Sequence, residues 1–175
     1  MTESLINIRP ATVDDAETIA DLSRSTFYET FAAQNSSKNM DLFLSEQFTW
    51  QRLVNEVGSP GNTFLLAYYE GELSGYVKLR QGEFPKQLRK DNALEIARIY
   101  ASKQFIGKGV GKALMQVSID VAKERNCPVI WLAVWEHNTR ALEFYKKWGF
   151  EIIGSQLFLL GHDLQKDWLM KKELD

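Results

Sequence analysis

The chain has 175 residues, of which 45% are hydrophobic and 25% are charged, and its formal net charge at pH 7 is −2. This composition is ordinary for a globular protein, and the length predicts a single domain over residues 1–175. The near-neutral charge argues against nucleic acid or a membrane surface as a partner. The lone cysteine, Cys127, excludes an intramolecular disulfide and favours a reducing, cytoplasmic location, and no apolar stretch is long enough to span a bilayer.

Hydrophobic periodicity, capping residues and turn signals predict strands and helices along the whole chain. Thr12 and Thr49 are good N-caps, and Glu70-Gly71-Glu72 is a hairpin signal. In chain order, we expect a strand at 5–9, a helix from 12 to about 26, a helical stretch around 40–44, a helix at 49–57, strands at 63–69 and 73–80, a polar, net-basic connection at 81–92, a strand at 93–101, a helix from 110 to about 125, a strand at 129–134, a helix after Asn138, and strands at 151–159 and 167–172.

A glycine-rich run, QFIGKGVGK at residues 104–112, lies between the strand at 93–101 and the next helix. Glycine lets the backbone come close to a ligand and adopt a positive φ. The helix start that follows offers unpaired N–H groups and the positive end of a dipole. The run therefore predicts a cradle for a phosphate-bearing ligand, to which Lys103, Lys108 and Lys112 add positive charge.

Two common phosphate-binding loops do not match this run. A Walker loop requires Ser or Thr after Gly-Lys, where this chain has Ala113. A dinucleotide-binding fingerprint requires G-x-G-x-x-G, whereas here the glycines alternate and position 112 is lysine. Gln104, Gly107 and Gly109 instead match the pattern Gln/Arg-x-x-Gly-x-Gly/Ala.

A second motif follows about thirty residues later, in the segment NTRALEFYKKWGF at 138–150. Asn138 and Tyr145 are seven positions apart, which places them on one helix face two turns from each other. Ala141 lies near that face and is small enough to let a thin ligand arm pass. Gly149 is the expected left-handed residue that ends the helix.

The two motifs, in this order and spacing, resemble those of the GCN5-related N-acetyltransferases, and the order β-α-α-β-β-β-α-β-α-β-β resembles their fold over nearly the whole chain. The resemblance implies a single-domain α/β (α+β) fold with a mixed central sheet flanked by helices, in which the parallel strands 93–101 and 129–134 splay apart. It implies acetyl-CoA as co-substrate, with the pantetheine arm paired along the splayed strand. No metal site is expected, because His137 and His162 are far apart and lack cysteines or paired carboxylates at ligand spacing. The residues implied to bind acetyl-CoA are Ile99, Tyr100, Ala101, Gln104, Gly107, Lys108, Gly109, Val110, Gly111, Lys112, Asn138, Ala141, Tyr145 and Lys147.

The implied reaction is direct transfer of an acetyl group to an amine. A free alkylamine is almost wholly protonated at pH 7, so an acidic group or a water chain must first remove a proton. Glu95 is the leading candidate for this base and Glu29 is a weaker one. Tyr145 can reprotonate the leaving thiolate, and the backbone N–H of Tyr100 or a neighbour can stabilise the oxyanion.

Three segments, 26–31, 94–100 and 131–138, further resemble the PaiA-type bacterial spermidine/spermine N-acetyltransferases. This resemblance implies a small-molecule primary amine, a polyamine, as acceptor, with Glu29, Tyr28 and Trp135 as substrate contacts. One position departs from it, because Ala97 stands where those enzymes carry glutamate. A protein or peptide N-acetyltransferase and a non-enzymatic CoA-sensing module remain as alternatives, and a homodimer is left open.

Overall fold

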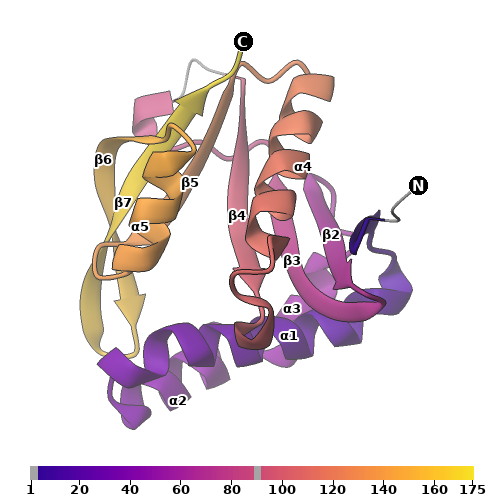
Figure 1. The fold of residues 1–175 in the computed structure, drawn as a ribbon. Coiled ribbons are helices and arrows are strands. Elements are labelled where there is room, and N and C mark those ends of the chain that lie inside the picture. Colours follow the sequence, from indigo (N-terminus) through magenta and orange to yellow (C-terminus); the bar gives the residue numbers. More distant parts are fainter. Residues whose placement is uncertain (1–3, 89–91) are drawn as a thin grey trace.

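The structure is a computed structural model that describes residues 4–88 and 92–175. Strands and helices follow one another along the described chain as Figure 1 shows. In order, they are β1 (Ile6–Pro10), α1 (Ala16–Phe31), α2 (Ser37–Glu46), α3 (Trp50–Glu56), β2 (Asn62–Tyr69), β3 (Glu72–Arg80), β4 (Ala93–Ala101), α4 (Val110–Glu124), β5 (Val129–Trp135), α5 (Thr139–Lys147), β6 (Glu151–Leu160) and β7 (Asp163–Glu173).

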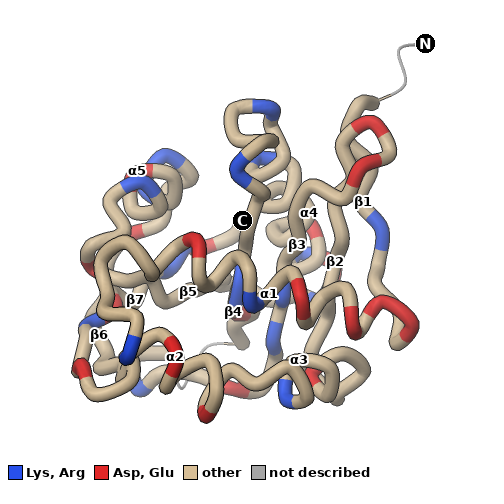
Figure 2. Tube along the Cα trace, turned by 90° about the horizontal axis from the view of Figure 1, so that it is seen from below, with Lys and Arg blue, Asp and Glu red and all other residues tan. Residues whose placement is uncertain are grey.

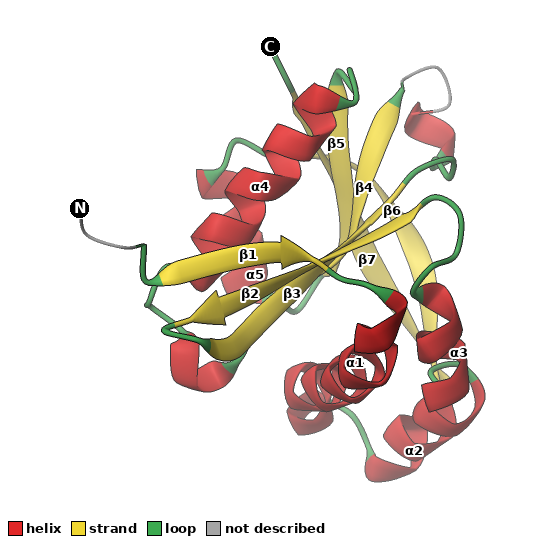
Figure 3. Ribbon diagram, turned by 90° about the vertical axis from the view of Figure 1, so that its right-hand side faces the viewer, coloured by secondary structure: helices red, strands yellow, loops and turns green. Residues whose placement is uncertain are grey.

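The strands form one mixed sheet with the order β1-β2-β3-β4-β5-β7-β6. β4 and β5 run parallel, and the other described neighbours are antiparallel. Helices α4 and α5 cover one face of the sheet, and α1, α2 and α3 cover the other (Figure 3). The predicted mixed α/β sheet with helices on both faces is confirmed.

Strand alternation separates two sets of core residues. On β4 and β5, Leu94, Ile96, Ile130 and Leu132 pack with Leu114 of α4 in the main core. Burial of each such aliphatic side chain contributes about 1.5–3 kcal/mol. On the opposite face, smaller aromatic clusters hold α1 and α2 against the sheet. The first core fixes β4, β5 and α4, which carry the predicted cradle.

α1 is longer than the sequence predicts. Thr12 is an N-cap as expected, but the turn it caps is a short 3₁₀ helix, and α1 then continues to Phe31 instead of ending near residue 26. Phe27 stacks on Phe43 of α2 with ring centroids 4.6 Å apart. This aromatic packing between helices extends α1, and the extension forms one wall of the site described below.

A β-bulge at Ala97 opens the sheet between β4 and β5. Lys78 of β3 pairs with Arg98 and the next residue, Leu79, pairs with Ile96, so Ala97 has no counterpart. β4 pairs with β5 only over Ala93–Glu95. A bulge bends its strand and increases the local twist. The two strands accordingly lie together near the C-terminus and separate toward α1 (Figure 1), which confirms the predicted splay.

Two other predicted elements are wrong in extent. The stretch around 40–44 is the middle of a longer helix, α2 (Ser37–Glu46), whose N-cap Ser36 accepts a hydrogen bond from the backbone N–H of Asn39. β7 begins at Asp163 rather than at 167. A tight turn at Gly161, which has a φ of 63°, connects the two strands, so that Leu160 at the end of β6 pairs with Asp163 at the start of β7.

The surface carries both signs of charge. Acidic and basic positions are interspersed over the helices on the α1 side (Figure 2). In the part of the chain that the structure describes, no helix is long and apolar enough to cross a membrane. Residues 89–91 of the predicted basic connection lie outside the described residues.

Candidate active site

Two adjoining cavities open where β4 and β5 separate. The larger has a volume of about 600 Å³ and lies between the end of β4, the segment 103–112 and α5; we call it the glycine cleft. The smaller, of about 200 Å³, lies under the second half of α1; we call it the aromatic pocket. They are continuous, because they share the lining residues Thr30, Ile99, Tyr100, Asn138, Ala141 and Tyr145.

The start of α4 forms one wall of the glycine cleft. Gly107 and Gly109 have φ of 82° and 87°, and Gly109 is the N-cap of α4. Val110, Gly111 and Lys112, in the first turn of α4, line the cleft. The N–H groups of a first helical turn have no partner within the helix, so this wall suits a pyrophosphate.

The splayed part of β4 forms a second wall. Ser102 donates its backbone N–H to Ser74 of β3 at 2.8 Å, and hydrogen-bonded pairs alternate along an antiparallel ladder. By this alternation the backbone groups of Tyr100 face β3, and those of Ile99 and Ala101 face the opening. The free edge can therefore pair with an extended amide-containing arm, and the oxyanion donor is a neighbour of Tyr100 rather than Tyr100 itself.

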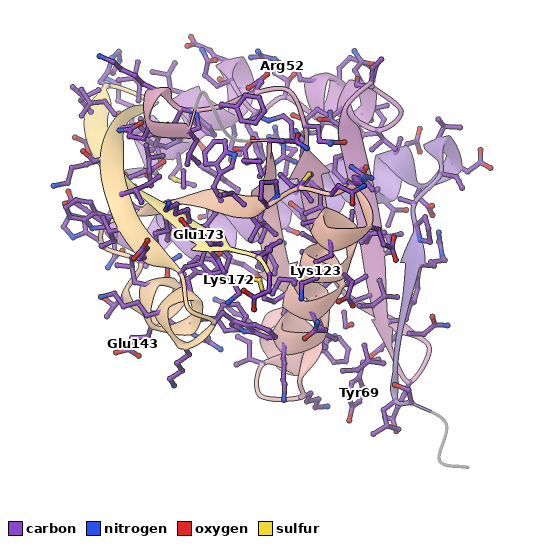
Figure 4. The ribbon with its side chains drawn as sticks, turned by 90° about the horizontal axis from the view of Figure 1, so that it is seen from above. Arg52, Tyr69, Lys123, Glu143, Lys172 and Glu173 are labelled. Carbon is purple, nitrogen blue, oxygen red and sulfur yellow. The ribbon has the colours of Figure 1, made fainter. Side chains whose placement is uncertain are left out.

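Tyr145 lies where the two cavities meet. It projects inward from α5 and is only 8% exposed, whereas Glu143 lies on the outer side of the same helix (Figure 4). Among the described residues, the Tyr145 hydroxyl has no hydrogen-bond partner. Burial raises the pKa of its phenol far above the ordinary value of 10.0. The hydroxyl is therefore a neutral donor whose proton is not committed to another group.

Asn138 and Ala141 keep α5 in register with the cleft. Asn138 is the N-cap of α5, and its Oδ1 accepts from the backbone N–H of Ala141 at 3.3 Å. Both residues line both cavities. The asparagine thus has a structural function at the position where the sequence predicted a ligand contact.

Most of the residues expected to bind acetyl-CoA line the glycine cleft. They are Ile99, Tyr100, Ala101, Gly107, Gly109, Val110, Gly111, Lys112, Asn138, Ala141 and Tyr145. Gln104, Lys108 and Lys147 do not line it. Lys108 lies over the rings of Tyr69 and Phe105, with its Nζ 5.0 and 5.4 Å from their centroids, and Tyr69 lies near the edge of the molecule (Figure 4). Lys147 is two residues past Tyr145, which turns it to the other face of α5.

Several lining residues were missed by the sequence analysis. Phe105, Ile106, Arg140 and Phe144 line the glycine cleft together with Lys103. Arg140 lies in the first turn of α5, two residues after the N-cap Asn138 and next to Ala141. This place in the motif is the signal that could have identified it. The cleft thus holds three cations, on Lys103, Lys112 and Arg140.

Glu95 does not line either cavity, which corrects its expected assignment as the base. It precedes the bulge at Ala97, in the part of β4 that is still paired with β5. Its Oε2 accepts from Arg80 Nε at 2.6 Å and its Oε1 from Arg80 Nη2 at 3.1 Å. This carboxylate is therefore held in a bidentate ion pair on the α1 side of the sheet.

Glu29 is the carboxylate that the structure brings to the cleft. The Tyr100 hydroxyl donates to Glu29, and burial together with this bond raises the pKa of Tyr100. Tyr28, an expected substrate contact, is 52% exposed and lines neither cavity, because one helix position turns it away from Phe27, which does line the aromatic pocket. Trp135 lines the aromatic pocket as expected.

Within residues 4–88 and 92–175, no three His, Cys, Asp or Glu side chains gather closely enough to hold a metal ion. The site instead combines a glycine-capped phosphate cradle, an open strand edge and a buried tyrosine. On the splayed sheet described above, these features would suit the pyrophosphate and the amide-containing arm of a coenzyme A thioester.

The chain belongs to the acetyltransferase (GNAT) family, whose model matches residues 17–150, and it is an N-acetyltransferase of that family. It is 38% identical over 153 residues to an uncharacterized N-acetyltransferase in the pepI 3′ region of Lactobacillus delbrueckii subsp. lactis, covering 87% of this chain and 88% of the relative. It is 26% identical to a spermidine N(1)-acetyltransferase of Thermoplasma acidophilum, over 84% of this chain and 89% of that protein.

A solved structure shows the same fold. The PaiA N-acetyltransferase from Thermoplasma acidophilum, crystallised in complex with coenzyme A, superposes with a TM-score of 0.76 and 22% identity, covering 97% of this chain and 99% of that chain. At this identity the likeness concerns the fold, and it confirms the architecture that the motifs predicted.

Proposed function

We propose that this protein transfers the acetyl group of acetyl-CoA directly to the primary amine of a small molecule. The observation that carries this proposal is the continuity of the two cavities at Tyr145. A thioester that enters from the glycine cleft and an amine held in the aromatic pocket would meet beside a buried, protonated phenol.

The glycine cleft suits each part of the cofactor. The pyrophosphate would bind the free N–H groups of the first turn of α4, as anions do at helix N-termini. The pantetheine amides would pair with the open edge of β4 at Ile99 and Ala101. Lys103, Lys112 and Arg140 would attract the phosphates.

The proton steps follow from the same geometry. The amine nitrogen forms a bond to the thioester carbonyl carbon, and the resulting tetrahedral oxyanion then expels the CoA sulfur as the carbon–sulfur bond breaks. Tyr145 would donate its proton to that thiolate. The pair of Tyr100 and Glu29 would accept the proton lost by the amine and pass it to solvent.

The size of the aromatic pocket favours a small acceptor over a protein, because the pocket lies under α1 and has a volume of only about 200 Å³. Spermidine and spermine are candidates supported by the names of relatives from Thermoplasma acidophilum and Bacillus subtilis, and by the carboxylate of Glu29 in the adjoining glycine cleft. Against them, Ala97 lines the pocket where a polyamine would need a carboxylate.

A thiol-release assay with acetyl-CoA tests the proposal. Spermidine, spermine, simple alkylamines, amino acids and a panel of peptides would be compared, and mass spectrometry would locate the added acetyl group. Release with a small amine but not with peptides is the expected result. Acetylation of peptides alone would overturn the choice of acceptor, and tight binding of acetyl-CoA without release for any amine would favour a CoA-sensing module.

A further inference from the structure

The aromatic pocket has an unusual charge for a site that takes an amine. Arg98 lines it, and no Asp or Glu belongs to its described wall. Glu29 lines the glycine cleft but not the pocket. The charged group inside the pocket is therefore a cation.

Arg98 is held firmly in place. Its Nη2 donates to Glu56 Oε2 of α3 at 2.5 Å, and its Nη1 donates to Ser23 Oγ of α1 at 3.4 Å. The guanidinium carbon lies 5.0 Å from the ring centroid of Phe48. Ser23 and Phe48 also line the pocket, so Arg98 is fixed at the end that lies toward α3.

The positive charge at this end is not fully balanced. Lys78 Nζ lies 3.2 Å from the same Oε2 atom of Glu56, so two cations share one carboxylate. The neighbouring Arg80 is already paired with Glu95. Burial and the charge of Arg98 lower the pKa of Lys78, as an excess of positive charge would. An anion bound in the pocket would balance the positive charge that Glu56 leaves uncompensated on Arg98 and Lys78.

A second donor in the wall also lacks a partner. The Trp135 side chain lines the pocket and is 6% exposed, and its Nε1–H has no acceptor among the described residues. Between these donors the wall is apolar, formed by Phe27, Phe31 and Phe48.

We infer that the acceptor is a primary amine with an anionic group, such as a carboxylate, at the far end of a short apolar spacer, and that Arg98 binds this group. The inference rests on the proposed function and names its class of acceptor. The amine would lie at Tyr145, the spacer between the phenylalanine rings, and the anion at Arg98. A polyamine would instead place a second ammonium against an unbalanced cation, which is unfavourable.

The test compares acceptors of equal length with the wild-type enzyme and acetyl-CoA. A convenient set is 5-aminopentanoate, pentylamine and 1,5-diaminopentane, with the shorter and longer homologues of each. We expect kcat/KM for the best amino acid to exceed that of its matched alkylamine by about tenfold or more. A hydrogen bond between the carboxylate and the charged Arg98 side chain would account for a factor of this size. We expect the matched diamine to be the poorest acceptor.

Two substitutions assign the preference to Arg98. Arg98→Gln should reduce the ratio of kcat/KM between the amino acid and the alkylamine to near one, and Arg98→Lys should restore part of it. Glu56 keeps Lys78 as a partner in both variants, so the fold is expected to survive. Arg52→Gln is the matched control, because Arg52 of α3 is outside the pocket (Figure 4) and its loss should leave the ratio unchanged.

Equal use of the three acceptor types, or a preference for the diamine, would overturn the inference while the proposed function stands. An amino-acid preference that persists in Arg98→Gln would also overturn it. Failure to acetylate any amine, with acetyl-CoA binding intact by calorimetry, would overturn the proposed function, and the inference would fall with it.

Discussion

The glycine cleft and the aromatic pocket adjoin at Tyr145, but they are built in different ways. The cleft uses backbone groups of β4 and of the first turn of α4, which come from the nearly contiguous segment 99–112, and α5 closes it. The pocket uses side chains from α1, the α2–α3 connection, β3, β4 and β5. Backbone recognition suits a cofactor common to a whole family, and side-chain recognition suits an acceptor that differs between its members.

Tyr145→Phe should have the largest effect at the boundary of the two regions. The ring stays and only the proton donor is lost, so we expect kcat to fall by about 10²–10⁴-fold with little change in acetyl-CoA affinity. Because burial raises the pKa of Tyr145, the donor stays protonated as pH rises past 10, and the wild-type rate should not decline through that range on its account. Tyr28→Phe, at an exposed position, is the control. Wild-type turnover in Tyr145→Phe would remove the residue from the mechanism.

Glu29→Gln tests which carboxylate serves the acceptor side. We expect kcat/KM for the amine to fall by about 100-fold, the lower end of general-base effects, because Glu29 is exposed. Glu95→Gln should instead preserve turnover and lower the free energy of unfolding by about 1–3 kcal/mol, since it breaks the ion pair with Arg80. Urea denaturation and steady-state kinetics of both variants separate the two effects, and the reverse pattern would restore Glu95 as the base.

Gly111→Leu tests the cleft without disturbing the pocket. Gly111 has helical backbone, and an added Cβ would lie 3.8 Å from Phe144, an ordinary contact. A leucine there should weaken acetyl-CoA binding by roughly tenfold to hundredfold, as overpacking by about 1–3 kcal/mol would. Gln116→Leu, on the exposed side of α4, is the calorimetric control. Gly109 is a poorer probe, because its φ of 87° would strain any side chain.

Lys112→Ala should have the smallest effect. An exposed charge pair contributes about 0–1 kcal/mol, so acetyl-CoA affinity should fall no more than roughly fivefold, and the difference should shrink as salt rises. Lys108→Ala is the comparison, because Lys108 does not line the cleft and its ammonium lies over the rings of Tyr69 and Phe105. A larger loss in Lys108→Ala than in Lys112→Ala would reverse our assignment of the cradle charges.

The sequence predicted most of the cleft because its determinants are local. Glycines at 107 and 109, the start of α4 and the Asn138 cap each depend on neighbours within a few residues, so motif spacing is enough to place them. Lys108 and Lys147, which the sequence places among the cofactor-binding residues, do not line the cleft, because composition near a cradle does not tell which way a side chain turns.

The pocket was predicted poorly because it depends on contacts between distant segments. Trp135, an expected substrate contact, lines the pocket, whereas Tyr28 does not and its neighbour Phe27 does. The bulge at Ala97 that opens the sheet has no signal in strand periodicity. The bulge leaves Glu95 in the paired part of β4, where it binds Arg80.

The sequence by itself determined the sheet, the phosphate cradle, the tyrosine and hence the family, because each follows from periodicity or from fixed spacing along the chain. Only the tertiary structure decided which carboxylate reaches the cleft and which charge enters the pocket. Glu29 and Arg98 are far apart in sequence, and their positions are set by how α1 and α3 pack on the bulged strand β4. Packing of that kind depends on many side chains at once, and a single sequence pattern does not encode it.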